Sequence, residues 1–238
     1  TKPQALQLLG EMGRLFSAIK LLGADKVGHW YQTLVAPYDF RDVTPTLPTR
    51  TFEGELVLNV GGREVHLIQV GPAHTQGDLI VFVPDAKTLF CGDLLFVGST
   101  PVMWAGSAAN WNAALDSILE MDVNVIVPGH GPITGKGGVR RVKAYWEYIA
   151  AEVPKCYEEG LSAKDAAYRI ARSDSFSQGP FADWNSPERL MTNAHIVYRH
   201  LEGRTDRLTE REMLFILRKQ AVLAYALPGA QPAVMRAR

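Results

Sequence analysis

The sequence is poor in cysteine and has no excess of either charge. Cys91 and Cys156 are the two cysteines among 238 residues, too few for a disulfide framework and too isolated for a cysteine-based zinc ribbon. Lysine plus arginine and aspartate plus glutamate both total 25, so the formal net charge is zero. Because nucleic-acid-binding proteins usually carry a basic patch, this balance predicts no nucleic acid among the partners.

Long apolar runs are also missing. No stretch approaches the roughly 18 uninterrupted apolar residues of a membrane-spanning helix, so we expect no membrane partner. The scarcity of cysteine favours a reducing compartment, which predicts a cytoplasmic location. The first residues, Thr1-Lys2-Pro3-Gln4, lack an initiator methionine and a signal-peptide pattern, and they suggest a chain that is processed, truncated or cut from something longer.

The residues that are present suffice for a folded core, since 47% of them are hydrophobic and 21% are charged. The apolar periodicity changes along the chain from helical to strand-like and then back. We expect strands at 56–58, 65–70, 79–83, 88–91 and 123–127, and helices at 3–22, 25–35, 109–121, 139–159, 163–172, 187–201 and 209–226. Strands that alternate with helices predict an α/β layered architecture.

Three of the expected strands end in the same way, at a glycine-bearing loop that holds a histidine or an aspartate. The strands and loop residues are 65–70 with His74, 88–90 with Asp93, and 123–127 with His130. Glycine lets the backbone bend sharply and approach a ligand closely, and strand-end loops are where α/β proteins build their sites. Two imidazoles and a carboxylate suit zinc, and also iron or manganese.

Each of these residues also has an ordinary structural explanation. His74 can be a turn histidine, Asp93 can cap a turn, and His130 can simply follow a glycine turn. The three lie too far apart in sequence for a single-turn metal motif, so they would converge only through the fold. The repetition of the pattern at three strand ends is what favours one shared metal site.

The segments around these residues resemble the metallo-β-lactamase superfamily, over residues 51–150. The matching motifs are Gly71-Pro72-Ala73-His74-Thr75-x-Gly77-Asp78, Phe90-Cys91-Gly92-Asp93-Leu94-Leu95-Phe96 and Val127-Pro128-Gly129-His130-Gly131. The resemblance implies a partial αββα sandwich with a helical C-terminal extension. It divides the chain into a metallo-β-lactamase-like domain at 1–160, whose N-terminal part is missing, and an extension at 161–238.

The resemblance also implies a dinuclear site, usually of zinc, with iron or manganese as alternatives. In it, His74 would bind the first metal, Asp93 would bridge both, and His130 would bind the second. Such a site would hydrolyse an ester, thioester, lactone or amide of a small molecule through a metal-bound hydroxide, since metal binding lowers the pKa of water from 15.7 to about 7. Nucleic-acid processing, as in the ribonuclease branch of the superfamily, is disfavoured by the zero net charge.

The family's His-x-His-x-Asp-His motif, which supplies the other ligands, is absent. The six histidines stand at 29, 66, 74, 130, 195 and 200, and no two are two positions apart. We therefore expect a fragment or one half of a split protein, whose second chain or a further copy completes the site. The alternative is a non-catalytic pseudoenzyme or partner subunit. We favour the former because an abandoned site need not keep all three ligands.

Asp78, Trp104 and Cys91 lie near the three ligand candidates in the sequence, and each has an expected role. Asp78 is expected to brace the His74 loop by accepting backbone N–H bonds, with orientation of a metal ligand as the alternative. Trp104 is expected to form a wall of a substrate pocket. Cys91 is expected to be a small buried residue, because the ligand position of the motif is Asp93. Without the missing part, residues 56–70 are expected to leave a strand edge and an apolar face uncovered.

Overall fold

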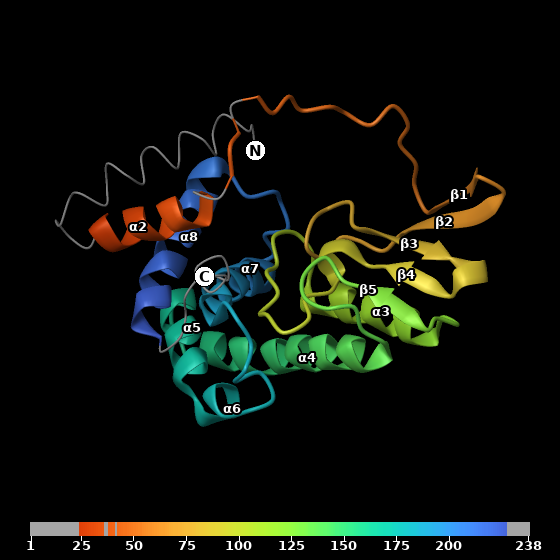
Figure 1. The fold of residues 1–238 in the computed structure, drawn as a ribbon. Coiled ribbons are helices and arrows are strands. Elements are labelled where there is room, and N and C mark those ends of the chain that lie inside the picture. The colour runs from red at the N-terminus through yellow and green to blue at the C-terminus, as the bar shows by residue number, and fades with distance from the viewer. Residues whose placement is uncertain (1–23, 36–37, 41, 228–238) are drawn as a thin grey trace.

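The computed structural model describes residues 24–35, 38–40 and 42–227 (Figure 1). The helix expected at 3–22 lies outside these residues. The described elements are α2 (Ala24–Val35), β1 (Glu55–Val60), β2 (Arg63–Gln69), β3 (Leu79–Val83), η2 (Pro84–Ala86), β4 (Thr88–Phe90), η3 (Gly92–Leu94), α3 (Ala108–Glu120), β5 (Val125–Val127), α4 (Lys136–Glu158), α5 (Ala163–Arg172), α6 (Asp174–Ser177), η4 (Pro187–Arg189), α7 (Leu190–Leu201) and α8 (Glu210–Ala226). The expected α/β architecture is confirmed, whereas the short α6 was not foreseen.

The five strands form one sheet in the order β1-β2-β3-β4-β5. β1 to β4 pair with one another in antiparallel order, and β5 runs parallel to β4. The β1–β2 hairpin turns at Gly61 and Gly62, whose φ angles of 61° and 83° lie where only glycine is unstrained. The Asn59 side chain accepts a hydrogen bond from the Gly62 N–H at 3.0 Å, which completes the expected hairpin.

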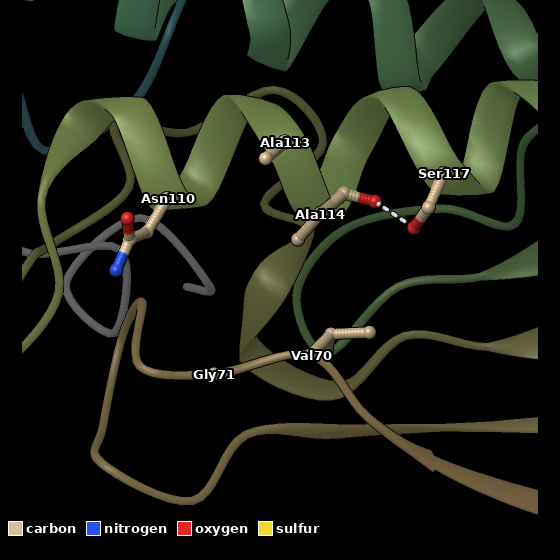
Figure 2. Close-up of a pocket in the computed structure, with 6 residues that line it drawn as sticks. All are labelled: Val70, Gly71, Asn110, Ala113, Ala114 and Ser117. Atoms are coloured by element: carbon tan, nitrogen blue, oxygen red, sulfur yellow. Dashed lines mark hydrogen bonds between the residues drawn. The ribbon is translucent and has the colours of Figure 1, made fainter. Parts of the chain in front are cut away.

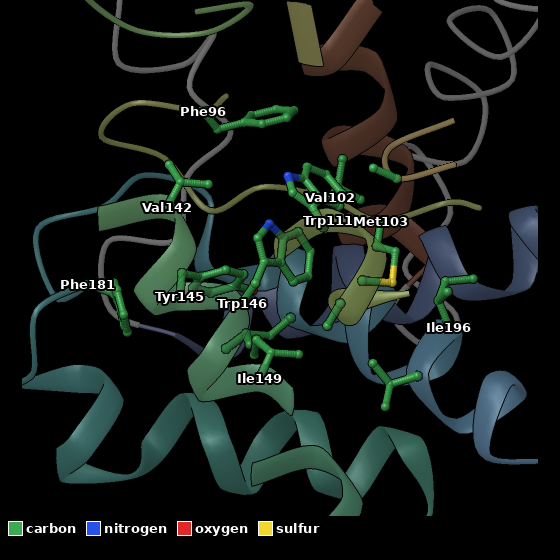
Figure 3. Close-up of a cluster of buried hydrophobic side chains, with 14 of the residues drawn as sticks. Phe96, Val102, Met103, Trp111, Val142, Tyr145, Trp146, Ile149, Phe181 and Ile196 are labelled. Carbon is green, nitrogen blue, oxygen red and sulfur yellow. The ribbon is translucent and has the colours of Figure 1, made fainter. Parts of the chain in front are cut away.

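One face of the sheet, the packed face, lies against helices α3 and α4 (Figure 1). Its residues alternate along the strands and are Ile68, Ile80, Phe82, Leu89 and Ile126. They join a cluster of buried side chains in which the rings of Trp111 and Trp146 lie 4.3 Å apart (Figure 3). Trp111 is fully buried in this cluster, and its indole N–H donates to the Leu94 carbonyl at 3.0 Å.

The other side of the sheet, the open face, is apolar but none of its apolar residues is buried. By strand register its apolar residues are Leu56, Leu58, Val60, Val65, Leu67, Leu79, Val81, Val83, Phe90, Val125 and Val127, and its polar residues are Arg63, Gln69 and Thr88. Val60 is 59% exposed, Phe90 44% and Val125 38%. β1 forms the outer edge of the sheet beside this face. Among residues 24–35, 38–40 and 42–227, the expected open edge and uncovered apolar face are therefore both present.

The helices that follow α4 wrap around its far end (Figure 1). Two of them begin with side-chain caps: Ser162 caps α5, and Thr209 forms a capping box with Glu212 at the start of α8. Both caps satisfy N–H groups that the first turn of a helix leaves free. The buried cluster continues from the sheet into these helices, and the division of the chain near residue 160 stays a prediction.

None of the helices in the described part of the chain is long and apolar enough to cross a membrane. The cytoplasmic location stays a prediction.

Candidate metal centre

The three strand-end loops bring His74, Asp93 and His130 together. Nε2 of His74 lies 3.4 Å from one carboxylate oxygen of Asp93, and Nε2 of His130 lies 3.3 Å from the other. One carboxylate therefore stands between two imidazoles that come from different loops. The hydrogen bond from His130 and the nearby His74 and Arg189 hold the pKa of Asp93 below its usual range.

The His74 imidazole is oriented through its other nitrogen. Nδ1 lies 2.6 Å from the Val102 carbonyl oxygen, which can only accept, so Nδ1 carries the proton and donates. Nε2 is then the nitrogen available to a metal, an arrangement typical of metal-binding histidines. The side chain is only 14% exposed, against 49% for His130, so the two ligand candidates differ in how tightly they are held.

Helix α7 fixes the segment that orients His74. The Asn193 side chain accepts from the Met103 N–H at 2.9 Å and donates to the Pro101 carbonyl at 2.9 Å. These two bonds lie on either side of Val102. Asn193 was not singled out from the sequence; the available signal was one amide among the apolar positions of a helix, since such a side chain is buried only when it is hydrogen-bonded.

Asp78 braces the loop that carries His74. Its carboxylate accepts from the backbone N–H groups of Ala73 and Thr75 at 2.9 Å each, and from the Thr75 hydroxyl at 2.8 Å. A carboxylate that accepts several such bonds holds a turn firmly. Its expected alternative role in orienting a metal ligand stays a prediction.

The Asp93 and His130 loops approach each other at Gly129. A Cβ atom at Gly129 would lie 2.4 Å from Asp93 Oδ1 and 2.5 Å from the Gly92 carbonyl oxygen, so only glycine permits this approach. The Gly129 N–H donates to that carbonyl at 2.8 Å. His130 then stacks on Phe96, with the ring centres 4.5 Å apart and the planes at 13°.

The three side chains fit a metal site only in part. They offer two imidazole nitrogens and a bridging carboxylate, which are the donor types of zinc sites. Nevertheless, in the described ranges no group of three or more His, Cys, Asp or Glu side chains is arranged to hold a metal ion. Three ligands divided over two metals would leave both underligated. A dinuclear zinc site therefore requires ligands beyond those that this chain brings together.

Cys91 and Trp104 flank the cluster without entering it. Cys91 is 1% exposed, as expected for a small buried residue, and burial raises the pKa of its thiol to about 12. The Trp104 N–H donates to the His74 carbonyl at 3.2 Å, while its side chain packs partly buried against the core. The role of Trp104 as a pocket wall stays a prediction.

A depression of about 300 Å³ lies between the end of β2 and helix α3 (Figure 2). Its lining residues are Val70, Gly71, Asn110, Ala113, Ala114 and Ser117. No charged side chain lines the depression. The Ser117 hydroxyl donates to the Ala114 carbonyl at 2.7 Å. Neither Trp104 nor any of the three ligand candidates lines this depression.

Comparison with known proteins supports the family indicated by these loops. Residues 9–130 match the model of the metallo-beta-lactamase superfamily. The alpha subunit of 2,4-dinitroanisole O-demethylase from Nocardioides sp. (strain JS1661) is 32% identical over 88 residues, which are 34% of this chain and 26% of that protein. Hydroxyacylglutathione hydrolase from Synechococcus sp. (strain CC9605) is 33% identical over 96 residues, 37% of each chain. The matches thus span about a quarter to a third of these relatives.

Solved structures show the same fold. The stereoselective inverting sec-alkylsulfatase Pisa1 from Pseudomonas sp. superimposes with a TM-score of 0.51 at 15% identity, covering 67% of this chain and 28% of that one. At this identity the likeness concerns the fold alone. The family model covers more than half of the chain and includes all three convergent loops. The chain belongs to the metallo-β-lactamase superfamily.

Proposed function

We propose that this chain carries one part of the active site of a metal-dependent hydrolase, which acts on an ester, thioester, lactone or amide of a small molecule. The observation that carries the proposal is the Asp93 carboxylate, whose two oxygens face His74 and His130 separately. A carboxylate placed in this way suits a bridge between two metal ions. Among the relatives, hydroxyacylglutathione hydrolase is named for a hydrolytic activity, which supports the reaction class.

His74, Asp93 and His130 would supply three ligands of a zinc pair, with iron or manganese as alternatives. Metal ions bound there would polarise the substrate oxygen and lower the pKa of the attacking water. The contribution of this chain is to hold its ligands in place: the Val102 carbonyl fixes the tautomer of His74, and Phe96 supports the plane of His130.

The remaining ligands would come from a polypeptide segment that bears His-x-His-x-Asp-His and covers the open face. The apolar side chains there are too many for an ordinary water-facing surface. The free edge of β1 offers N–H and C=O groups to an added strand, so the segment is expected to contain β-structure. A second copy of this chain would bring the same three ligands and no such motif, which makes it the weaker candidate.

A non-catalytic subunit is the second candidate, favoured by the missing motif. One relative is itself named as a subunit, of an O-demethylase. Such a subunit would fold and contact a partner through the open face without completing a metal pair. The two candidates therefore differ in metal content and in hydrolysis, not in the surface they use.

The test is to produce the chain alone and together with the polypeptide encoded immediately upstream of residue 1, and then to measure metal by elemental analysis. The chain alone is expected to hold metal weakly, and the assembled protein about two ions per site. Hydrolysis of a panel of esters, thioesters and lactones should appear only in the assembled protein and disappear with a chelator. An assembled protein that binds no metal would overturn the hydrolase proposal.

Two variants sharpen this test. His74→Ala should reduce the metal content of the assembled protein, because it removes a ligand held by a dedicated hydrogen bond. His29→Ala is the matched control, since His29 is an exposed histidine of α2. Equal metal content in both variants would separate His74 from the metal centre.

A further inference from the structure

A guanidinium from the helical extension reaches the edge of the ligand cluster. Arg189 ends η4, and its Cζ lies over the ring of Phe96, 5.4 Å from the ring centre. The same ring stacks on His130 at 4.5 Å and lies 5.9 Å from the ring of His74. Phe96 therefore joins the arginine to both ligand candidates, although Arg189 lies 59 positions after His130 and 115 after His74 in the sequence.

Arg189 is held in place by the loop that follows Asp93. Its Nη1 donates to the Thr100 carbonyl at 2.8 Å. The Thr100 N–H in turn donates to the Asn185 carbonyl at 2.8 Å, and the Asn185 N–H donates to the Gly98 carbonyl at 3.0 Å. The turn before Arg189 and the loop after Asp93 thus form one hydrogen-bonded unit. A cation fixed in this way needs little reorganisation to bind a ligand.

Among the residues that the structure describes, Arg189 forms no ion pair within 4.0 Å. A guanidinium has five N–H donors, and the bond to Thr100 is its one hydrogen bond within the described part of the chain. Burial lowers its pKa, and the negative charges of Glu188 and Asp93 oppose that effect. Desolvating a charge without a direct partner is costly, so a purely structural arginine would be expected to have a carboxylate beside it.

We infer that Arg189 binds an anionic group of the substrate beside the ligand cluster. This inference rests on the proposed function and narrows it to esters, thioesters, lactones or amides that carry a carboxylate, sulfate or phosphate. The planar fork of arginine suits such oxyanions because it can donate two parallel hydrogen bonds. Arg189 is partly exposed as a residue although its guanidinium is mostly buried, so we expect only a small anionic group to reach the donors that Thr100 leaves free.

The first test needs no metal and no turnover. Inorganic phosphate is titrated into the chain while the side-chain NMR signals of His130 and Phe96 are followed. Wild type should show saturable shifts, and Arg189→Met should bind phosphate about tenfold more weakly or worse. Arg140→Met is the matched control, because Arg140 is an exposed arginine on α4. Arg189→Lys should fall between them, since it keeps the charge and loses the fork.

Several outcomes would overturn the inference. Phosphate that shifts no signal near Phe96 in wild type would do so, and this result does not depend on how any variant folds. Equal phosphate affinity in Arg189→Met and Arg140→Met would assign Arg189 a structural role at Thr100. Should Arg189→Met fail to fold, as judged by circular dichroism, Arg189→Lys carries the comparison.

The second test uses the assembled protein and a pair of esters that differ only in a carboxylate and its methyl ester. The ratio of kcat/KM for the anionic over the neutral ester should fall about tenfold or more in Arg189→Met. Hydrolysis of neither ester would count against the proposed function, while the phosphate titration would still decide the role of Arg189. Hydrolysis of both with a ratio unchanged by Arg189→Met would overturn the inference and leave the hydrolase proposal standing.

Discussion

The two faces of the sheet are built from the same strands and meet opposite surroundings. On the packed face, Leu89 and Ile126 are 0% exposed and lie against α3 and α4. On the open face, their sequence neighbours Phe90 and Val125 are 44% and 38% exposed. Successive residues of a strand point to opposite sides, so one step along the chain separates the interior from the surface.

The open face is exposed although its residues are mostly apolar, so residue type alone does not explain why one face is covered and the other is not. At the hairpin, where the packed-face side extends beyond the helices, it becomes mostly polar: His66 contacts Glu55 and Glu64 at 2.5 Å each, beside the exposed Val57. The open face stays mostly apolar there, with Leu56 and Leu58 on the same side as Arg63. A surface meant for water would be expected to follow the first pattern. The open face follows the pattern of an interior whose covering layer is not part of the described residues.

The largest effect on stability in the chain alone should come from Leu89→Ala. Removing a fully buried leucine leaves a cavity and costs about 2–5 kcal/mol of unfolding free energy. Phe90→Ala, one residue away on the open face, should cost less, about 1 kcal/mol, because Phe90 is already 44% exposed and its removal leaves no closed cavity. Urea unfolding of both variants measures the contrast, and equal losses would mean that the open face is covered in solution.

Asp78→Ala should have the next largest effect. Asp78 lies just before β3, whose first residues Leu79 and Ile80 point to the open and the packed face. The change leaves the N–H groups of Ala73 and Thr75 without their acceptor, which should cost about 1–3 kcal/mol. Asp85→Ala is the control. Its exposed ion pair with Arg63 is expected to contribute less than about 1 kcal/mol, so similar losses would contradict the bracing role.

A polar open face should scarcely change the stability of the chain alone. The double variant Val81→Thr, Phe90→Gln is expected to alter the unfolding free energy by less than about 1 kcal/mol. The same variant should lose association with the segment that carries His-x-His-x-Asp-His, because it places polar groups in an apolar contact. Analytical ultracentrifugation of the mixture measures this. Undiminished association would show that the partner binds elsewhere.

The smallest effect should be a pH dependence of the hairpin. Hydrogen bonds to Glu55 and Glu64 raise the pKa of His66, so protonated His66 stabilises the folded hairpin. That contribution is fully present below the ordinary histidine pKa of about 6.5 and is lost as pH rises through the higher folded value. Hydrogen exchange of the β1 and β2 amides should therefore quicken on raising pH beyond the intrinsic rate change. His66→Gln should remove that excess, and an unchanged excess would refute the assignment.

Much of the sheet and of the ligand cluster could be predicted because their signals are local. The run Leu79–Val83 is apolar throughout and became β3 with those bounds. His74, Asp93 and His130 each follow a strand, and strand ends that share an edge bring their loops together. The starts of the helices expected at 163–172 and 209–226 are local signals too, since the caps at Ser162 and Thr209 involve residues three positions apart.

The contributions of Asn193 and Arg189 could not be read in this way. Asn193 bonds to Met103 and Arg189 to Thr100, contacts that depend on how α7 docks rather than on any local pattern. Local periodicity places a helix but does not say which loop it touches. The open face shows the same limit: the alternation of its residues was legible, but what covers it lies in another segment.

The bonds of Asn193 also set an order of events during folding. The hydrogen bond from the Met103 N–H requires the Asn193 side chain, 90 positions later in the chain. Contacts of such long separation form slowly because a long loop must close first. The sheet hairpins can form from neighbouring residues. The Val102 carbonyl that orients His74 is expected to reach its final position only after α7 has docked. The ligand cluster is therefore expected to form late in folding.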